Sequence, residues 1–303
     1  MIERRLAPSD PTNPAERIPP SVRIGEVAVY GLSDGFFRLD GGAMFGVVPK
    51  VLWDRVSPAD ERNRIRLGLH PVLIQAHGHC ILVETGVGSR HDAAFADRFG
   101  VEQPPTLVAS LAAVGVRPDD VDFVVNTHLH WDHAGGNVMA RDDRLTPTFP
   151  KATYVVQAAD WEEAIHPHER NHGSYRPEDY LSVAEAGLLR LVDGSLELVA
   201  GVHLERVGGH TRGTQIVRVT SGGSTLAYLG DLVPTSRHVD YAWLMSYDLY
   251  PAETLEQKKR VLPRAAAEGW IVAFPHDPEH HFGRIRLEQA RGRERPVFEP
   301  LAP

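Results

Sequence analysis

The chain of 303 residues is 42% hydrophobic, enough to build one large domain or two small ones around a substantial core. Its formal net charge of -8 comes from 40 acidic and 32 basic residues, and no basic run resembles a phosphate-binding tract, which argues against nucleic acid as a partner. Cys80 is the single cysteine, which excludes an internal disulfide and a cysteine-based zinc site. Because it stands in the apolar run CILV, we expect a buried thiol without a catalytic role.

Residues 1–21 differ in character from the rest of the chain. They are rich in proline and charge and show no periodicity, which predicts an arm that is disordered or contacts the second subunit of a homodimer. Residues 22–303 are expected to form a single α/β domain. No segment has the apolar core of a secretory signal or the length of a bilayer-spanning helix, so the sequence predicts a cytoplasmic protein without a membrane partner.

Short apolar runs separated by glycines predict strands in the first part of the chain. Strands are expected over residues 26–32 and 35–39, and a hairpin with a tight glycine turn over residues 71–86. A helix over residues 106–116 leads into an apolar strand over residues 121–125.

Strands and helices also alternate in the second part of the chain, interrupted by an irregular segment over residues 165–187. Such a segment in an otherwise regular domain is often a lid or a pocket wall. The elements expected around it are strands over 152–157, 196–207, 215–220, 225–231 and 270–276, and helices over 158–165 and, on both sides of Pro263, 253–270. The alternation favours a sandwich of two sheets with helices outside.

The segment THLHWDHAGG, residues 127–136, concentrates potential metal ligands directly after an apolar strand. Four of them fall within six positions: His128, His130, Asp132 and His133. Imidazole and carboxylate ligands without thiols suit zinc, manganese, iron or cobalt in a catalytic site with an open position. Gly135 and Gly136 would let the loop close and begin a helix. The alternative, a surface loop that binds metal adventitiously, is disfavoured by four ligands in one HxHxDH pattern.

HLHWDH resembles the HxHxDH signature of the metallo-β-lactamase superfamily, whose fold is an αββα sandwich with a metal site at one edge. The resemblance implies a further histidine, aspartate and histidine, each at the end of a strand. GGHTRGTQ, YLGDLV and FPHDP supply them in that order: His210, Asp231 and His276.

The resemblance implies two divalent metal ions per chain, expected to be zinc, with manganese, iron or cobalt as alternatives. One ion would be held by His128, His130 and His210, the other by Asp132, His133 and His276, and Asp231 would bridge them. A hydroxide shared by two cations is a nucleophile at neutral pH, so the implied chemistry is hydrolysis of a carbonyl or phosphorus ester.

Two details of the site concern carboxylates. Asp132 and Asp231 are the expected catalytic residues, and Asp132 would take a proton or steer the leaving group. In ILVETG, Glu84 stands where the family usually has an aspartate. Its longer side chain either keeps a hydrogen bond to a ligand or is a surface charge at a strand end.

The segment DGGAMFGVVPKVLW, residues 40–53, resembles a loop of the branch containing N-acyl homoserine lactonases and methyl parathion hydrolase. It would give the pocket an apolar wall, and the residues expected to line that pocket are Met44, Phe45, Val47, Val48, Trp53 and Trp131. The alternative for the loop residues is core between two early strands. Some lactonases carry a tyrosine three residues after the bridging aspartate, where this chain has Pro234. Tyr247 either replaces it or is a core residue with a satisfied hydroxyl.

The sequence therefore predicts a dinuclear metal-dependent hydrolase that opens lactones, N-acyl homoserine lactones in particular. The main alternative is an organophosphate triester or aryl ester hydrolase on the same site. An oxidoreductase is disfavoured because the flavodiiron pattern replaces an HxHxDH ligand with glutamate, whereas this chain keeps His130. The acidic balance disfavours nucleic-acid processing, and the full ligand set disfavours a non-enzymatic module.

Overall fold

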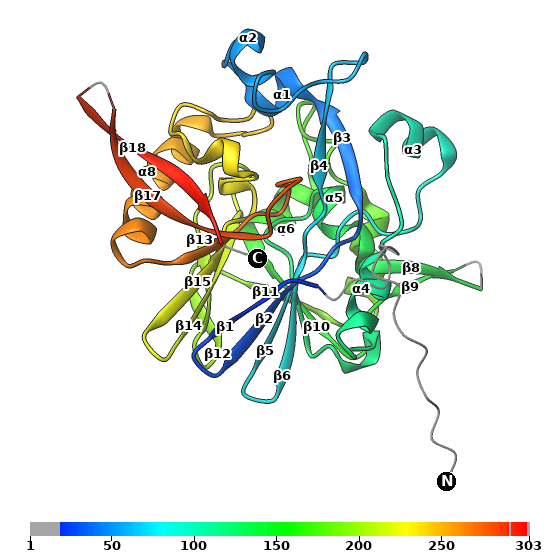
Figure 1. Cartoon of the computed structure of the whole chain (residues 1–303). Helices are drawn as coiled ribbons and strands as arrows, with labels where there is room; N and C mark the ends of the chain where they lie inside the picture. Colours follow the sequence, from blue (N-terminus) through cyan, green and yellow to red (C-terminus); the bar gives the residue numbers. More distant parts are fainter. Residues whose placement is uncertain (1–18, 143, 291, 302–303) are drawn as a thin grey trace, which may run out of the picture.

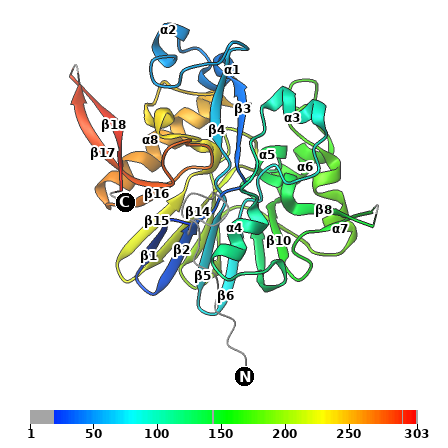
Figure 2. The same ribbon diagram turned by 45° about the vertical axis from the view of Figure 1, so that its right-hand side comes forward.

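Two seven-stranded sheets packed face to face form the centre of the structure, a computed structural model that describes residues 19–142, 144–290 and 292–301 (Figure 1). Helices cover the outer face of each sheet, as both views show (Figure 2). The predicted αββα sandwich is therefore confirmed.

The first sheet comes from the first two thirds of the chain. In spatial order its strands are β1 (Ser21–Ile24), β2 (Val27–Gly31), β5 (Val72–Ala76), β6 (His79–Val83), β7 (Phe123–Val125), β10 (Thr153–Gln157) and β11 (Leu189–Val192). Strands β6, β7, β10 and β11 are parallel neighbours, and the other pairs are antiparallel.

The second sheet comes from the last third and keeps sequence order. Its strands are β12 (Leu196–Val199), β13 (Val202–Arg206), β14 (Gln215–Ser221), β15 (Ser224–Tyr228), β16 (Ile271–Ala273), β17 (Phe282–Ala290) and β18 (Arg293–Pro300). Only β15 and β16 pair in parallel, across the long connection that contains the main helix of this half.

The core between the sheets follows from the two-residue period of their strands. In β6, Ile81 and Val83 face the second sheet, whereas Leu82 faces the helices outside. Leu226 and Tyr228 of β15 likewise face inward. Each buried aliphatic side chain contributes roughly 1.5–3 kcal/mol. Strands covered on both faces are continuously apolar, which is why these runs are readable in the sequence.

Helices on the first sheet are α4 (Leu107–Ala113), α6 (Ala158–Ile165) and α7 (Leu181–Glu185), and α8 (Pro251–Ala267) covers the second. The two helical stretches expected around Pro263 form one continuous helix. Pro251 occupies its first position, where no N–H is needed.

A small ribbon and three short helices stand at the edge of the sandwich where the strand ends meet (Figure 1). They are β3 (Phe36–Asp40), β4 (Arg64–Gly68), α1 (Gly41–Phe45), α2 (Lys50–Trp53) and α3 (Ala93–Phe99). The segment 40–53, expected to be a loop, is therefore mostly helical. The Asp40 carboxylate accepts a hydrogen bond from the Ala43 amide at 2.8 Å and so caps α1.

The remaining elements are short. They are α5 (Trp131–Ala134), the hairpin β8 (Val138–Arg141) and β9 (Arg144–Pro147), and the 3-10 turns Pro118–Asp120, Gly135–Asn137, Pro177–Asp179, Gly230–Leu232 and Ser236–Val239.

Residues 1–18 of the predicted arm lie outside the described residues, and β1 already begins at Ser21. The division into an arm and a domain thus stays a prediction. Within the described residues, no helix is long and apolar enough to cross a membrane.

Candidate metal centre

The histidine-rich segment begins directly after β7, at the edge where parallel strands end. His128 and His130 point the same way because they are two residues apart, while Leu129 between them is fully buried in a separate cluster. The Leu129 amide donates a hydrogen bond to the Asp160 carboxylate at 2.7 Å, which fixes the backbone between the two imidazoles.

Helix α5 starts at Trp131, before either glycine, and Gly135 begins the 3-10 turn Gly135–Asn137, so the glycines begin a 3-10 turn and not an α-helix. Both glycines also allow two backbone segments to lie in close contact. A Cβ atom at Gly135 would clash with the carbonyl of Val87, and one at Gly136 with the carbonyl of Thr85. The two glycines let the segment lie directly against the chain that follows β6.

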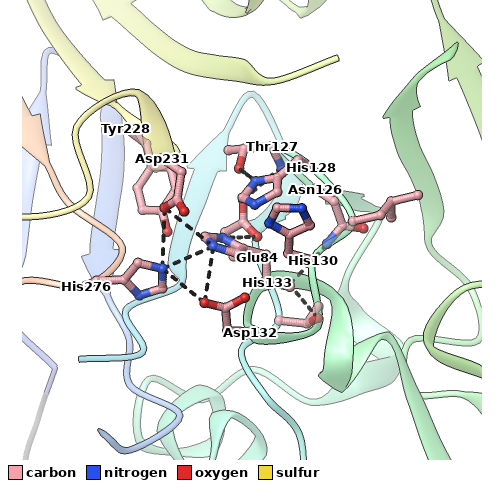
Figure 3. A network of polar contacts seen from close by, with 12 residues as sticks. Glu84, Asn126, Thr127, His128, His130, Asp132, His133, Tyr228, Asp231 and His276 are labelled. Atoms are coloured by element: carbon pink, nitrogen blue, oxygen red, sulfur yellow. Dashed lines mark hydrogen bonds and ion pairs between the residues drawn. The ribbon is translucent and has the colours of Figure 1, made fainter. Parts of the chain in front are cut away.

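The other three predicted ligands come from connections of the second sheet. Asp231 lies in the 3-10 turn after β15, His276 follows β16, and His210 lies between β13 and β14. The structure brings all seven predicted ligand side chains together, and their ligand atoms form three overlapping groups, each within 4.8 Å. Figure 3 labels all of them except His210. The groups are His128, His130 and His210; His128, His133 and Asp231; and Asp132, His133 and His276.

Asp231 lies between His210 on one side and His133 and His276 on the other. Its Oδ2 is 3.3 Å from His210 Nε2, and its Oδ1 is 3.5 Å from His133 Nε2 and 3.4 Å from His276 Nε2. Each carboxylate oxygen therefore faces a different group, which is the arrangement that a bridging ligand requires.

In four of the imidazoles, the nitrogen that points away from the centre of the cluster, Nδ1, has a polar partner. His128 Nδ1 lies 3.0 Å from Thr127 Oγ1, and His276 Nδ1 lies 2.9 Å from the Gly68 carbonyl. His210 Nδ1 lies 3.0 Å from the Asp248 carboxylate, a partner that the sequence reasoning missed. With Nδ1 occupied, these rings present Nε2 to the centre.

Glu84 supports the fourth of these imidazoles. It is 2% exposed, so it is not a surface charge, and its Oε2 lies 3.1 Å from His133 Nδ1. Its Oε1 accepts a hydrogen bond from the Thr127 amide at 2.8 Å. The backbone of Glu84 has a positive φ of 69°, which turns the chain at the strand end. The longer side chain thus contacts His133, a predicted ligand, which is the first of the two alternatives for Glu84.

Burial and charge act in opposite directions on the buried imidazoles. Burial lowers the pKa of His128 and His130 well below the usual value, and neighbouring imidazoles add to this effect. Burial also opposes a charge on His133, but Asp231, Glu84 and Asp132 outweigh it and raise its pKa well above the usual value. The pKa of Asp231 is lowered, because the facing histidines overcome the effect of its burial.

The donor set fits divalent metal ions. His210 Nε2 lies 3.1 Å from His130 Nδ1, and His276 Nε2 lies 3.1 Å from His133 Nε2, so imidazole nitrogens converge in pairs. Within the described residues, His128 Nε2 has no hydrogen-bond partner although it is buried. Buried nitrogens without partners are costly unless a cation occupies the space between them. Nitrogen and oxygen donors of this kind suit zinc, manganese, iron or cobalt.

A cavity of about 280 Å³ opens onto this cluster. Of the residues predicted to form the pocket, Met44, Trp131 and Tyr247 line it, together with ligands from both groups. Phe45, Val48 and Trp53 do not reach it: they are buried in the cluster that supports Met44 from behind, where Phe45 stacks on Trp53 at 5.5 Å. Val47 points away and is 92% exposed.

Several residues that line the cavity were not predicted from the sequence. Leu39, Phe99 and Met245 extend the apolar wall, and Arg170 and Ser174 come from the segment 165–187, whose expected role as a pocket wall the structure bears out. Met245 lies two residues before Tyr247 in the sequence, so its neighbourhood was a usable signal. Phe99 carried no such signal, and for Arg170 the only signal was its place in the irregular segment 165–187.

The chain belongs to the metallo-beta-lactamase superfamily, because residues 70–276 match that family over most of the domain. An N-acyl homoserine lactonase of Bacillus thuringiensis is 29% identical over 175 residues, which are 57% of this chain and 62% of that protein. The chain thus spans about three fifths of that relative's length. A second N-acyl homoserine lactonase, from Bacillus cereus, is 26% identical over 235 residues, 73% of this chain and 86% of that protein.

Solved structures agree with this placement. A protein of Staphylococcus aureus described as a probable metal-dependent hydrolase is 31% identical, with a TM-score of 0.83 over 92% of this chain and 99% of its own. A dizinc quorum-quenching lactonase has a TM-score of 0.76 over 93% of this chain and 97% of its own. At 20% identity, the second likeness shows a shared fold. The family and the fold expected from the sequence are confirmed.

Proposed function

We propose that this protein is a metal-dependent hydrolase that opens small lactones, with N-acyl homoserine lactones as the first candidate substrates. The observation that carries the proposal is the position of Asp231, whose two oxygens face two separate histidine groups at the floor of a largely apolar cavity. The lactonases among the relatives support the choice of substrate.

Two divalent ions would be held at the predicted ligands, with zinc as the first candidate. One would take His128, His130 and His210, the other Asp132, His133 and His276, and Asp231 would serve both. When bound, such ions supply Lewis-acid polarisation of the substrate oxygen and a source of nucleophilic water at neutral pH.

The protein side chains around the ions orient the substrate and move the proton. Asp132 is the most exposed of the carboxylates in the cluster, with 10% of its side chain accessible, and it borders the cavity. It is placed to accept a proton during attack and to return it to the leaving alkoxide. Burial raises the pKa of Tyr247 to about 12, so its hydroxyl stays protonated at neutral pH and can donate to a substrate oxygen.

The apolar wall selects the rest of the substrate. Met44, Phe99, Trp131 and Met245 offer an acyl chain a dry surface and keep bulk water from the reacting carbonyl. A phosphotriester or aryl ester hydrolase on the same site is the second candidate, because the same nucleophile attacks a phosphorus ester in line.

The test is pH-monitored hydrolysis of an N-acyl homoserine lactone, an unsubstituted lactone, a phosphotriester and an aryl ester, with metal content measured on the same sample. Proton release on the lactones at two bound ions per chain is the expected result. Turnover of the phosphotriester alone would favour the second candidate. Two bound ions without turnover of any substrate would contradict both.

A further inference from the structure

Among the described residues that line the cavity, Arg170 is the only arginine or lysine. It stands in the segment that follows α6, and this segment is attached to the metal-binding loop. The Trp131 amide donates to the Ser174 carbonyl at 3.0 Å, and Tyr175 forms a bridge with His130. The backbone that carries Arg170 is therefore fixed relative to the predicted ligands.

The guanidinium itself is held by one of its nitrogens. Nη2 of Arg170 donates to the Ser246 carbonyl at 2.7 Å and to the Asp248 carbonyl at 3.2 Å. Within the described residues, neither Nε nor Nη1 has a hydrogen-bond partner, and no carboxylate forms an ion pair with Arg170. Other arginines of this edge do form ion pairs: Arg38 and Arg66 share the carboxylate of Glu102.

The wall around this charge is otherwise mainly apolar. Leu39, Met44, Phe99 and Met245 would surround a bound chain, so the cavity combines a metal-binding floor, an apolar wall and one uncompensated cation. Arg170 is exposed, so water hydrates its free guanidinium donors, and a neutral substrate lying against them would displace this water without replacing its hydrogen bonds. A carboxylate would accept two charge-assisted hydrogen bonds from the same donors, which is the geometry that arginine favours.

Building on the proposed hydrolase function, we propose that Arg170 determines specificity by binding a carboxylate on the substrate, at the end of a short apolar chain remote from the reacting ester. The substrate class is then a small lactone or ester with an acidic tail. Attack and ring opening are unchanged, because Arg170 contacts only the tail.

The test compares two matched pairs of substrates that differ only at the end of the chain. The first pair is N-hexanoyl homoserine lactone and its 5-carboxypentanoyl analogue, and the second is p-nitrophenyl hexanoate and the mono-p-nitrophenyl ester of hexanedioic acid. Arg170→Met is expected to raise KM for the carboxylated member of each pair by about tenfold or more. KM for the neutral member and kcat for both should stay within about twofold.

Control variants separate recognition from folding and from overall charge. Arg190→Met removes one exposed charge from β11, away from the cavity, and should leave all four KM values unchanged. Arg170→Lys keeps the charge but loses the planar guanidinium that can donate two parallel hydrogen bonds to a carboxylate. It should give an intermediate KM for the carboxylated substrates. In the wild type, added salt should raise KM for the carboxylated substrates only.

Equal KM values for the two members of a pair, or an equal effect of Arg170→Met on both, would overturn this inference and leave the proposed function intact. A wild type that hydrolyses none of the four substrates would overturn the proposed function and this inference together.

Discussion

The cavity has a metal side, formed by the predicted ligands, and a substrate side, formed by the apolar wall and Arg170, and the two differ in how their side chains are held. On the metal side, the imidazoles of His128, His133, His210 and His276 each have a partner at Nδ1, and the segments that carry them follow sheet strands. On the substrate side, the wall is assembled from loops, short helices and the end of β3, and its apolar members pack on one another. On the metal side, four imidazoles are held at Nδ1 by hydrogen bonds or by an ion pair, whereas the substrate side depends on packing and leaves Nε and Nη1 of Arg170 without partners among the described residues.

Loss of the bridging carboxylate should have the largest effect of any substitution considered. Asp231→Asn removes the charge that faces both histidine groups, so metal content should fall below two ions per chain. Turnover should fall by about a thousandfold or more, since loss of an outer partner alone costs about 10–100-fold. Elemental analysis and kinetics on one sample measure both. Asp34→Asn, at a buried carboxylate bonded to the Gly88 and Leu107 amides, is the matched control and should keep both ions. Two bound ions and normal turnover in Asp231→Asn would refute the bridging assignment.

Substitution behind the metal side should weaken metal binding more moderately. Glu84→Gln keeps the size of the side chain and the acceptor for the Thr127 amide but removes the charge 3.1 Å from His133 Nδ1. Metal affinity, measured by competition with a chelator, should fall about 10–100-fold. An unchanged affinity would mean that the neutral amide orients His133 equally well.

Substitution on the substrate side should change turnover without changing metal content. Tyr247→Phe removes a hydroxyl for which the described residues provide no hydrogen bond, and should lower kcat/KM by about tenfold. Metal content is the internal control. If rates on every ester stay normal, Tyr247 is a packing residue of the cavity wall.

The last effect concerns the support of the substrate side and is a pH dependence of stability, with no change in activity expected. The buried Lys258 ammonium donates to the Asp240 carbonyl at 2.6 Å and to the Trp243 carbonyl at 2.9 Å, and so holds the segment that leads to Tyr247. Burial lowers its pKa to about 7, against an ordinary value of about 10.4 in the unfolded chain.

Between these two pKa values the unfolded chain holds more protons at Lys258 than the folded chain. Its contribution to the free energy of unfolding therefore rises with pH above about 7, by on the order of 1 kcal/mol per pH unit, and is constant at lower pH. Denaturant unfolding at pH 7 and pH 9 should show this rise in the wild type and in Lys259→Met, an exposed neighbour on α8, but not in Lys258→Met. Parallel behaviour of all three proteins would contradict the lowered pKa.

The difference between the metal side and the substrate side also explains which residues could be predicted from the sequence. The metal side was readable because strand periodicity locates β7 and β15, and ligand residue types follow directly after them. The substrate side combines residues as far apart as Met44, Phe99, Arg170 and Tyr247, so no local pattern marks it. Phe45 and Trp53 have the composition of a pocket wall but pack behind it, because composition does not specify direction.

Errors in the fold have similar causes. Strands β17 and β18 were not predicted, although RIRLE in β17 alternates polar and apolar residues. Pro296 and the charges of β18 argue against a strand, yet β18 is an edge strand, where proline is tolerated. Asp248 could not be assigned, since its contact with His210 spans 38 residues.

The predicted ligands come from both sheets: His128, His130, Asp132 and His133 follow β7 of the first, whereas His210, Asp231 and His276 follow strands of the second. Bound ions would therefore cross-link the two layers of the sandwich at one edge, as a disulfide would in a chain with paired cysteines. Ligands that bind only the folded state stabilise it in proportion to the logarithm of their free concentration. With such ions bound, the heat resistance of this protein would depend on the metal supply of its surroundings as well as on its hydrophobic core, and scarcity of metal would remove catalysis and the cross-link between the layers together.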